Sequence, residues 1–209
     1  MKKQSGARNI FDKYAAEYEA KYMDVGLYHE GLDQFLNQLK TKHASLLEIG
    51  CGPGNLTRYL LSRNQNLKIL GIDFAENMIP LAIKNNPQAE FRLMDSRDIL
   101  SLQQQFDGIV CGFCIPYLKK EEVVKLIRDI SSLLKPEGVL YLSTMEAFED
   151  RSGIAYSDSA EESMEINYYQ FEFLEALLKK QSLKILFKTR LDNPSNPEDV
   201  KDLVLLAAR

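Results

Sequence analysis

Three glycines at alternating positions mark the stretch of this chain with the clearest chemical meaning. An apolar run at residues 45–49 indicates a buried strand, and Gly50, Gly52 and Gly54 follow it directly. Helical spacing of apolar residues begins at Leu56. A strand, a glycine turn and a helix in this order form the first half of a nucleotide-binding unit. Glycine is needed there because the turn is tight and because a ligand must approach the backbone closely.

A carboxylate completes the pattern 19 residues after Gly54. Residues 67–72 form a second apolar run that ends at Asp73, where a carboxylate can accept hydrogen bonds from both hydroxyls of a ribose. A dinucleotide and S-adenosylmethionine both fit this arrangement. The dinucleotide fingerprint G-x-G-x-x-G requires a third small residue, but Asn55 and Thr57 occupy the two possible positions. The spacing therefore favours S-adenosylmethionine.

Five motifs, in order, resemble those of the class I S-adenosylmethionine-dependent methyltransferases, and the resemblance extends from about residue 10 to the C-terminus. Ala75 stands where the family usually has serine, and Glu137 where it has the first glycine of a turn. Neither position touches the ribose or the glycine loop in the family. The similar segments are residues 48–54 (motif I), 71–78 (the acidic-loop motif), 91–96 (the end of the third strand), 106–111 (motif IV) and 134–140 (the turn before the fifth strand).

The resemblance implies that S-adenosylmethionine is the methyl donor and S-adenosylhomocysteine the product. It places the glycine loop at the methionine part of the cofactor, Asp73 at the ribose, and Asp95 at the amino edge of the adenine. Phe74 and Met78 flank the adenine in relatives; the alternatives are ordinary core packing for both, and a helix N-cap for Asp73. The expected cofactor residues are Tyr14, Glu48, Gly50, Cys51, Gly52, Asn55, Asp73, Phe74, Met78, Asp95, Ser96, Cys111 and Phe113.

The N-terminal segment resembles the leader of many small-molecule methyltransferases. Residues 11–18 have the pattern F-D-x-x-A-x-x-Y, and in those enzymes an aromatic residue of the leader closes over the methionine end of the cofactor. Packing of the helix onto the core is the alternative role for Tyr14 and Tyr18. The residues expected on the acceptor side are Tyr18, Tyr28, Tyr117 and Tyr168.

The sulfonium of S-adenosylmethionine already activates the methyl group, so the protein has to align a nucleophile and exclude water. A base is required only when the nucleophile arrives protonated. No catalytic residue is assigned, because His43 precedes the first strand and His29 is expected to cap a helix. Cys111 and Cys114 match C-x-x-C, but a zinc site would need two more ligands, so the match is interpreted as coincidence and no metal is expected.

Two other functions stay as alternatives. A Rossmann-type oxidoreductase that uses NAD(P) would share the strand, glycine turn and helix, although Asn55 and Thr57 disfavour it. A module that binds the cofactor without transferring its methyl group would agree with the absence of an apparent base.

The rest of the chain supplies the elements that position these residues. Strands that alternate with helices indicate a parallel sheet covered on both faces. The predicted fold is α/β, Rossmann-like and doubly wound, with a mostly parallel seven-stranded sheet, an antiparallel last strand and helices on both faces. A single methyltransferase domain is expected over residues 1–209, with an N-terminal helical extension at 1–43. Strands are predicted at 45–49, 67–73, 89–94, 106–112, 139–143, 183–189 and 203–208, and the first two helices at 10–22 and 28–40.

The alternation stops at residues 145–167, which show no clear period and carry seven acidic residues against one arginine. The segment leaves the carboxyl end of the fifth strand, the edge at which such sheets bind ligands. Long loops within compact domains are often functional, so a substrate lid is predicted; a solvated acidic loop is the alternative. The charge of the segment predicts a neutral or cationic small-molecule acceptor.

Composition excludes several classes of partner. A net charge of -4 gives no basic footprint for nucleic acid, and no apolar stretch reaches the length of a membrane span, about 18 to 20 residues. Three cysteines argue against a disulfide framework, and the polar N-terminus does not resemble a signal peptide. The sequence therefore predicts a cytoplasmic protein that acts on a small molecule and binds neither nucleic acid nor membrane.

Overall fold

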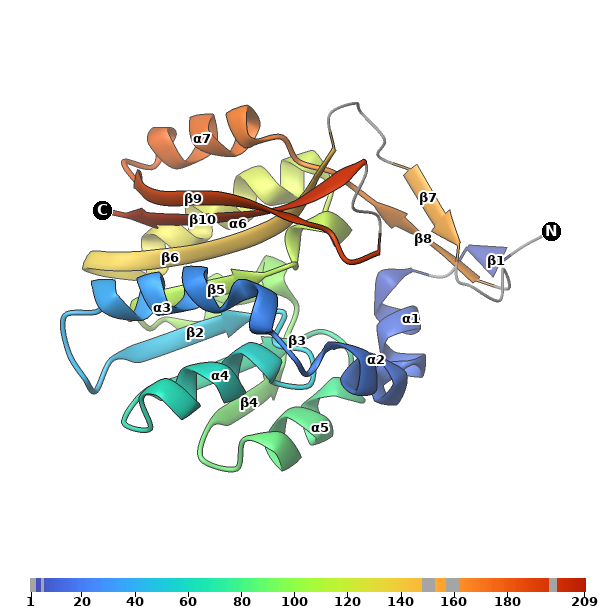
Figure 1. Cartoon of the computed structure of the whole chain (residues 1–209), viewed down its shortest axis with the longest axis horizontal. Coiled ribbons are helices and arrows are strands. Elements are labelled where there is room, and N and C mark those ends of the chain that lie inside the picture. The colour runs from blue at the N-terminus through green and yellow to red at the C-terminus, as the bar shows by residue number, and fades with distance from the viewer. Residues whose placement is uncertain (1–2, 5, 148–152, 157–161, 196–198) are drawn as a thin grey trace.

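The computed structural model describes residues 3–4, 6–147, 153–156, 162–195 and 199–209, and a sheet of seven strands lies at the centre of this part of the chain (Figure 1). The strands are β2 (Ser45–Ile49), β3 (Lys68–Asp73), β4 (Glu90–Leu93), β5 (Phe106–Gly112), β6 (Leu134–Ala147), β9 (Lys184–Asp192) and β10 (Val200–Ala208). Their order is β4-β3-β2-β5-β6-β10-β9. The first five strands in this order, β4, β3, β2, β5 and β6, run parallel to one another. The strand β10 runs antiparallel to both of its neighbours, β6 and β9. This confirms the predicted sheet with its antiparallel last strand.

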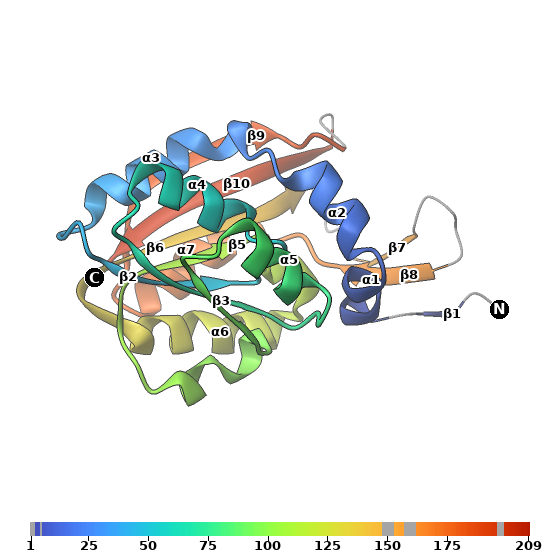
Figure 2. The same ribbon diagram turned by 90° about the horizontal axis from the view of Figure 1, so that it is seen from below.

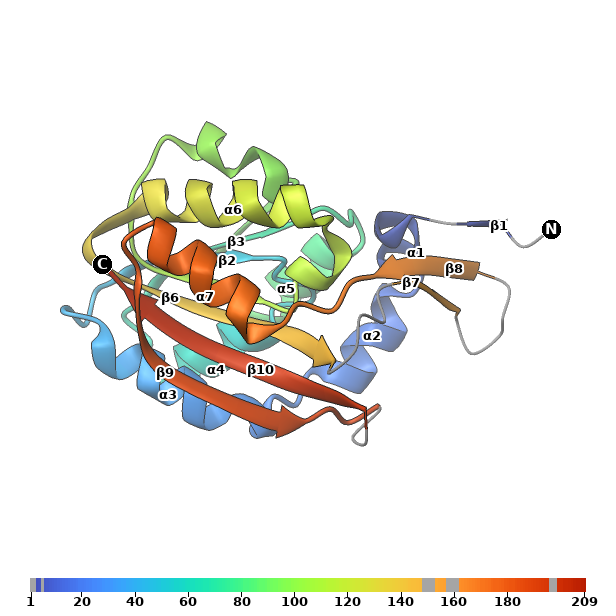
Figure 3. The same cartoon turned by 90° about the horizontal axis from the view of Figure 1, so that it is seen from above.

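Helices cover both faces of the sheet (Figures 2 and 3). One face carries α3 (His29–Gln38), α4 (Asn55–Arg63) and α5 (Met78–Asn85), and the other carries α6 (Lys120–Leu133) and α7 (Phe171–Lys180). The predicted doubly wound arrangement is confirmed. The described part of the chain also contains three short 3-10 helices, η1 (Gly26–Tyr28), η2 (Ser96–Leu102) and η3 (Ile115–Tyr117). None of the helices in the described residues is long and apolar enough to cross a membrane.

Successive side chains of the central strands build two separate cores. In β2, Leu46 packs on the side of α3 and α4, together with Phe35 and Leu60. Leu47 and Ile49 point to the opposite face and pack on the side of α6 and α7. Since adjacent side chains of a strand point to opposite faces, a strand buried on both faces is apolar without interruption. This explains why Leu46, Leu47 and Ile49 are all apolar, and it leaves Glu48 as a buried polar exception in β2.

The N-terminal extension bends at Tyr14 and is not the single helix expected at residues 10–22. The first helix, α1 (Ala7–Lys13), ends there, and α2 (Ala15–Tyr22) begins at the next residue. Both helices lie beyond the carboxyl ends of the parallel strands (Figure 2). The bend brings Phe11 and Tyr18 together, with ring centroids 5.6 Å apart.

Paired strands occupy much of residues 145–167, where an irregular loop was expected. β6 continues to Ala147, and β7 (Gly153–Tyr156) pairs antiparallel with β8 (Glu162–Ile166). The N-terminal β1 (Lys3–Gln4) joins β8 in parallel and completes a separate three-stranded sheet. Such short strands give no clear period, and this pairing joins distant parts of the chain. Residues 148–152 and 157–161, which include four of the seven acidic residues, lie outside the described residues.

The strand β6 also begins earlier than predicted, at Leu134 rather than at residue 139. Glu137 lies in this early part and has a left-handed backbone conformation, with φ of 61°. Glycine adopts such a conformation without steric cost. This explains why the family has glycine at the position that Glu137 occupies here.

A buried carboxyl group joins β2 to α4. Glu48 is 1% exposed, and its Oε2 accepts a hydrogen bond from the hydroxyl of Thr57, which is also buried. Among the described residues, Oε1 of Glu48 has no hydrogen-bond partner. Burial raises the pKa of Glu48 to about 8, so the protonated form is favoured near neutral pH.

Replacing Gly108 in β5 by alanine should destabilise the fold. A Cβ there would lie 2.6 Å from Cζ of Phe35 and 2.9 Å from Cδ2 of Leu46, so the core would have to shift. Overpacking of this kind costs about 1–3 kcal/mol. Urea unfolding should show this loss for Gly108→Ala. The control Gly6→Ala adds a Cβ with no atom within 4 Å and should change stability much less; equal stability of both variants would contradict the packing described.

The proton on Glu48 should make stability depend on pH. The folded protein holds this proton more tightly than the unfolded chain does. Protonated Glu48 therefore adds to the free energy of unfolding in full below about pH 4.5, and this contribution is lost as the pH rises to about 8. Glu48→Gln keeps an acceptor for Thr57 but cannot titrate. Melting temperatures measured between about pH 5 and pH 9 should therefore fall less steeply for Glu48→Gln than for the wild type. The exposed Glu121→Gln should keep the wild-type slope, and the same slope in all three proteins would refute a tightly held proton.

Candidate active site

A cavity opens between the carboxyl ends of the parallel strands and residues of α1 and α2. Ten residues that the sequence assigned to the cofactor or the acceptor line it: Tyr18, Gly50, Gly52, Asp73, Phe74, Met78, Asp95, Ser96, Phe113 and Tyr117. Six residues without a prior assignment complete the wall: Phe11, Met94, Arg97, Gly112, Cys114 and Leu118. The cavity therefore draws on the ends of β2, β3, β4 and β5 together.

The carboxylate of Asp73 links two of these strand ends. Its Oδ2 accepts a hydrogen bond of 2.8 Å from the backbone N–H of Gly52, and its Oδ1 accepts one of 2.9 Å from that of Ala75. Gly50, Gly52 and Gly54 all have left-handed backbones, with φ of 70°, 50° and 80°. Glycine adopts these backbone angles without strain, whereas other residues at these three positions would be strained. It presents the N–H of Gly52 to the carboxylate.

Asp73 retains capacity for a ligand. A carboxylate has about four lone-pair sites, and the two backbone N–H groups use one on each oxygen. The side chain is buried, which raises the pKa of Asp73 above its usual value, while the hydrogen bonds from Ala75 and Gly52 act in the opposite direction. The alternative role as a helix N-cap is wrong, because α5 begins at Met78 and Asn77 occupies its N-cap position.

The strand β4 brings a second carboxylate into the cavity wall. The backbone N–H of Met94 donates to the carbonyl oxygen of Asp73 over 2.9 Å, which fixes the two strand ends side by side. Asp95 follows, and hydrogen bonds from Arg97 hold its pKa below the usual value, so this carboxylate is ionised at neutral pH. Met78 lines the cavity and also packs against Ala15 of α2, so its role in the core and its place at the site coexist.

Aromatic side chains from separate elements form the opposite end of the cavity. The Phe11 ring of α1 lies 4.8 Å from the Tyr117 ring of η3 and 5.6 Å from the Tyr18 ring of α2, both in edge-to-face geometry. Burial raises the pKa values of Tyr18 and Tyr117, so both remain neutral phenols. Within the described residues neither hydroxyl has a hydrogen-bond partner, so both are available to a ligand.

Phe113 adopts a strained backbone conformation at the end of β5. Its φ of 49° is in the left-handed region, which is uncommon for a bulky residue. The surrounding structure maintains it: the Phe113 N–H donates to the carbonyl oxygen of Ser143 over 3.0 Å, and the Tyr28 ring lies 5.2 Å away. The hydroxyl of Tyr28 in turn donates to the buried Asp202 over 2.7 Å. Tyr28 thus supports the cavity wall from behind.

Seven residues assigned from the sequence do not line the cavity: Tyr14, Tyr28, Glu48, Cys51, Asn55, Cys111 and Tyr168. Tyr14 lies at the bend between α1 and α2, with the ammonium of Lys13 over its ring. Cys51 and Cys111 are buried in the hydrophobic core. The side-chain amide of Asn55 donates to the backbone oxygen of Tyr22 over 2.9 Å and so fastens α4 to the N-terminal helices.

The six unassigned wall residues had partial signals in the sequence. Most are direct neighbours of assigned residues, such as Met94 before Asp95 and Gly112 before Phe113. Phe11 and not Tyr14 lines the cavity, because Tyr14 lies at the bend between α1 and α2, which periodicity does not reveal. Cys114 lines the cavity and Cys111 is buried, and the described residues contain no group of His, Cys, Asp or Glu that could hold a metal ion.

This chain is similar in sequence to known methyltransferases. A malonyl-[acyl-carrier protein] O-methyltransferase of Priestia megaterium is 29% identical over 137 residues, 64% of this chain and 49% of that protein. The tRNA N(3)-methylcytidine methyltransferase trm140 of Schizosaccharomyces pombe is 29% identical over 144 residues, 62% of this chain and 47% of that protein. This chain therefore spans about half the length of these two relatives.

A solved structure shares the fold. It is the 1,6-didemethyltoxoflavin-N1-methyltransferase of Burkholderia thailandensis with bound 1,6-didemethyltoxoflavin and S-adenosylhomocysteine. The TM-score is 0.74 at 19% identity, with 97% of this chain and 86% of that chain covered. A family profile described as a methyltransferase domain matches residues 16–186. Since that match spans most of the chain, the chain belongs to the S-adenosylmethionine-dependent methyltransferases, a family of enzymes that use S-adenosylmethionine as cofactor.

Proposed function

We propose that this enzyme transfers the methyl group of S-adenosylmethionine to a small molecule bound at the aromatic end of the cavity. The observation that carries the proposal is the continuity of one cavity from Asp95 to Tyr117, since it places polar groups suited to a nucleoside next to an aromatic chamber. Family membership removes the support for an oxidoreductase that uses NAD(P). We take residues 1–209 as a single methyltransferase domain.

The cofactor is proposed to lie along the strand ends. The two free lone-pair sites of Asp73 would accept the ribose hydroxyls, and the backbone at Gly50 and Gly52 would border the methionine part. Asp95 and the backbone of Ser96 would meet the amino edge of the adenine. This assignment uses the wall residues and leaves Glu48, Cys51 and Cys111 as supports beneath them.

The bound cofactor supplies a methyl group that its sulfonium has already activated. The remaining task of the chain is to align an acceptor in line with the methyl group and to exclude water. Phe11, Tyr18, Phe113 and Tyr117 would perform both functions, because their rings fill the acceptor end and the two tyrosine hydroxyls can orient a polar group. Transfer to the aligned acceptor would leave S-adenosylhomocysteine as the product.

The charges of the wall favour a neutral or cationic acceptor. Asp73 and Asp95 contribute carboxylates, whereas the guanidinium of Arg97 is engaged by both Asp95 and Glu122. A cationic group would also be attracted to the aromatic rings. We propose a small molecule rather than a nucleic acid, because a net charge of -4 opposes binding of a polyanion.

We further propose that the β7–β8 hairpin covers the acceptor end. The backbone N–H of Asn167, directly after β8, donates to the carbonyl oxygen of Pro116 over 2.8 Å. The hydroxyl of Tyr169 donates to the carbonyl oxygen of Leu118 over 2.5 Å. These bonds fix the end of the hairpin beside Tyr117, so the hairpin has a defined anchor at the cavity.

Asp73→Ala should weaken cofactor binding. The ribose hydroxyls would lose their hydrogen bonds to the charged Asp73 carboxylate. This loss should weaken the binding free energy of S-adenosylhomocysteine by about 1.5–3 kcal/mol, measured by calorimetric titration. The matched control is Asp107→Ala, which removes a carboxylate that accepts from Ser45 and Lys135 outside the cavity wall. Asp107→Ala should bind as the wild type does. Unchanged affinity in a folded Asp73→Ala protein would overturn the ribose assignment.

Acceptor charge can be tested with S-adenosylmethionine labelled in its methyl group. Small acceptors of matched size that carry an amine, a hydroxyl or a phosphate should be compared with bulk tRNA. The label should enter neutral or amine-bearing compounds, because the carboxylates of the wall raise the cost of bringing an anion close. Efficient transfer to the phosphorylated compounds or to tRNA would contradict the proposed acceptor class.

A further inference from the structure

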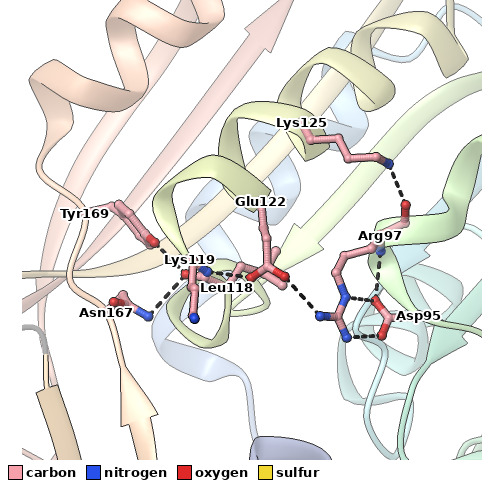
Figure 4. A network of polar contacts seen from close by, with 8 residues as sticks. All are labelled: Asp95, Arg97, Leu118, Lys119, Glu122, Lys125, Asn167 and Tyr169. Carbon is pink, nitrogen blue, oxygen red and sulfur yellow. Dashed lines mark hydrogen bonds and ion pairs between the residues drawn. The ribbon is translucent and has the colours of Figure 1, made fainter.

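The guanidinium of Arg97 holds the carboxylate of Asp95 through both of its oxygens (Figure 4). Nε of Arg97 donates to Oδ1 over 2.8 Å, and Nη2 donates to Oδ2 over 2.5 Å. The backbone N–H of Arg97 donates to Oδ1 as well, over 2.9 Å. Of the roughly four lone-pair sites of a carboxylate, these donors leave one, on Oδ2.

Arg97 is itself held in place from the other side. Its Nη1 donates to Oε1 of Glu122 over 3.0 Å, while Oε2 of Glu122 accepts from the backbone N–H of Lys119 over 2.7 Å (Figure 4). The ammonium of Lys125 donates to the backbone oxygen of Arg97 over 2.5 Å. Isolated exposed ion pairs contribute little, but bidentate pairs within a network have a fixed geometry. The first turns of α6 thus fix the group that fixes Asp95.

We propose that Arg97 determines the purine selectivity of the cofactor site, because it leaves Asp95 one fixed acceptor position that matches a 6-amino purine and rejects a 6-oxo purine. This inference rests on the proposed placement of the adenine at Asp95. A 6-amino group donates a hydrogen bond to that position. A 6-oxo group would place an acceptor against an acceptor, and such unpaired polar contacts are the strongest source of discrimination between similar ligands.

The role of Arg97 differs from that of a simple structural ion pair. Without the guanidinium, only the backbone N–H of Arg97 still donates to Oδ1 of Asp95, so Oδ2 loses its fixed position and no longer opposes a 6-oxo group at one defined place. Removal of Arg97 should therefore change the ratio of the affinities for the 6-amino and the 6-oxo ligand, and should not merely weaken both by the same factor. Arg97 acts through Asp95 and is a positioning residue.

Calorimetric titration with S-adenosylhomocysteine and its 6-oxo analogue, S-inosylhomocysteine, measures this ratio without an acceptor or turnover. The wild type should bind S-adenosylhomocysteine roughly tenfold or more tightly than the analogue, the fold-change of one hydrogen bond to a charged group. In Arg97→Ala this preference should shrink by roughly tenfold. Arg97→Lys, which keeps the charge but loses the bidentate geometry, should also have a reduced preference, and it replaces Arg97→Ala if that variant fails to fold.

The matched control is Arg92→Ala in β4. Arg92 forms a similar ion pair, with 2.6 Å between its Nη2 and Oε1 of Glu90, but it does not line the cavity. This variant should keep the full wild-type preference. An unchanged preference in folded Arg97→Ala or Arg97→Lys protein would overturn the inference while leaving the cofactor assignment intact. A wild-type protein that binds neither compound would instead overturn the cofactor assignment.

Discussion

The site depends on one carboxylate that accepts hydrogen bonds from two loops. Asp73 receives the backbone N–H of Gly52 from the loop after β2 and that of Ala75 from the loop after β3. The two loops must therefore approach each other before any ligand arrives, and the left-handed glycines make this approach possible. A buried carboxylate without these donors would be costly, so the same contacts that shape the loops also make the charge tolerable.

The other parts of the cavity are arranged around this junction. The neighbouring β4 is fixed to it through the Met94 N–H, and thereby brings Asp95 to the same edge. On the far side, Phe11 and Tyr18 close the cavity from α1 and α2, and Phe113 reaches it by means of a strained backbone that Ser143 and Tyr28 maintain. Polar groups suited to a nucleoside and aromatic groups suited to an acceptor thus share one cavity because adjacent parallel strands end at one edge.

Much of this arrangement could be predicted from the sequence, and the limits have physical causes. The strands of the central sheet are buried on both faces, so their apolar runs located them well, as in Ser45–Ile49 and Phe106–Gly112. The glycine spacing and Asp73 located the ligand edge. The bend at Tyr14 was missed because helical periodicity continues across it, and Phe11 consequently was not assigned to the site. The β7–β8 hairpin was missed because it pairs with β1, a contact between distant segments. The pair of hydrogen bonds from the Arg97 guanidinium to Asp95 depends on a side-chain geometry that sequence spacing alone does not specify.

The central claim is that the cavity at Asp73 is built for S-adenosylmethionine and not for a dinucleotide. The most direct test is the melting temperature of the full chain with increasing S-adenosylhomocysteine, NAD or NADP, because a ligand that binds only the folded protein must raise it. S-adenosylhomocysteine should raise the melting temperature further as its concentration increases, because it adds about 2.7 kcal/mol to the free energy of unfolding at a hundredfold excess over its Kd. NAD and NADP should leave the melting temperature unchanged. A rise with NAD or NADP and none with S-adenosylhomocysteine would contradict the account.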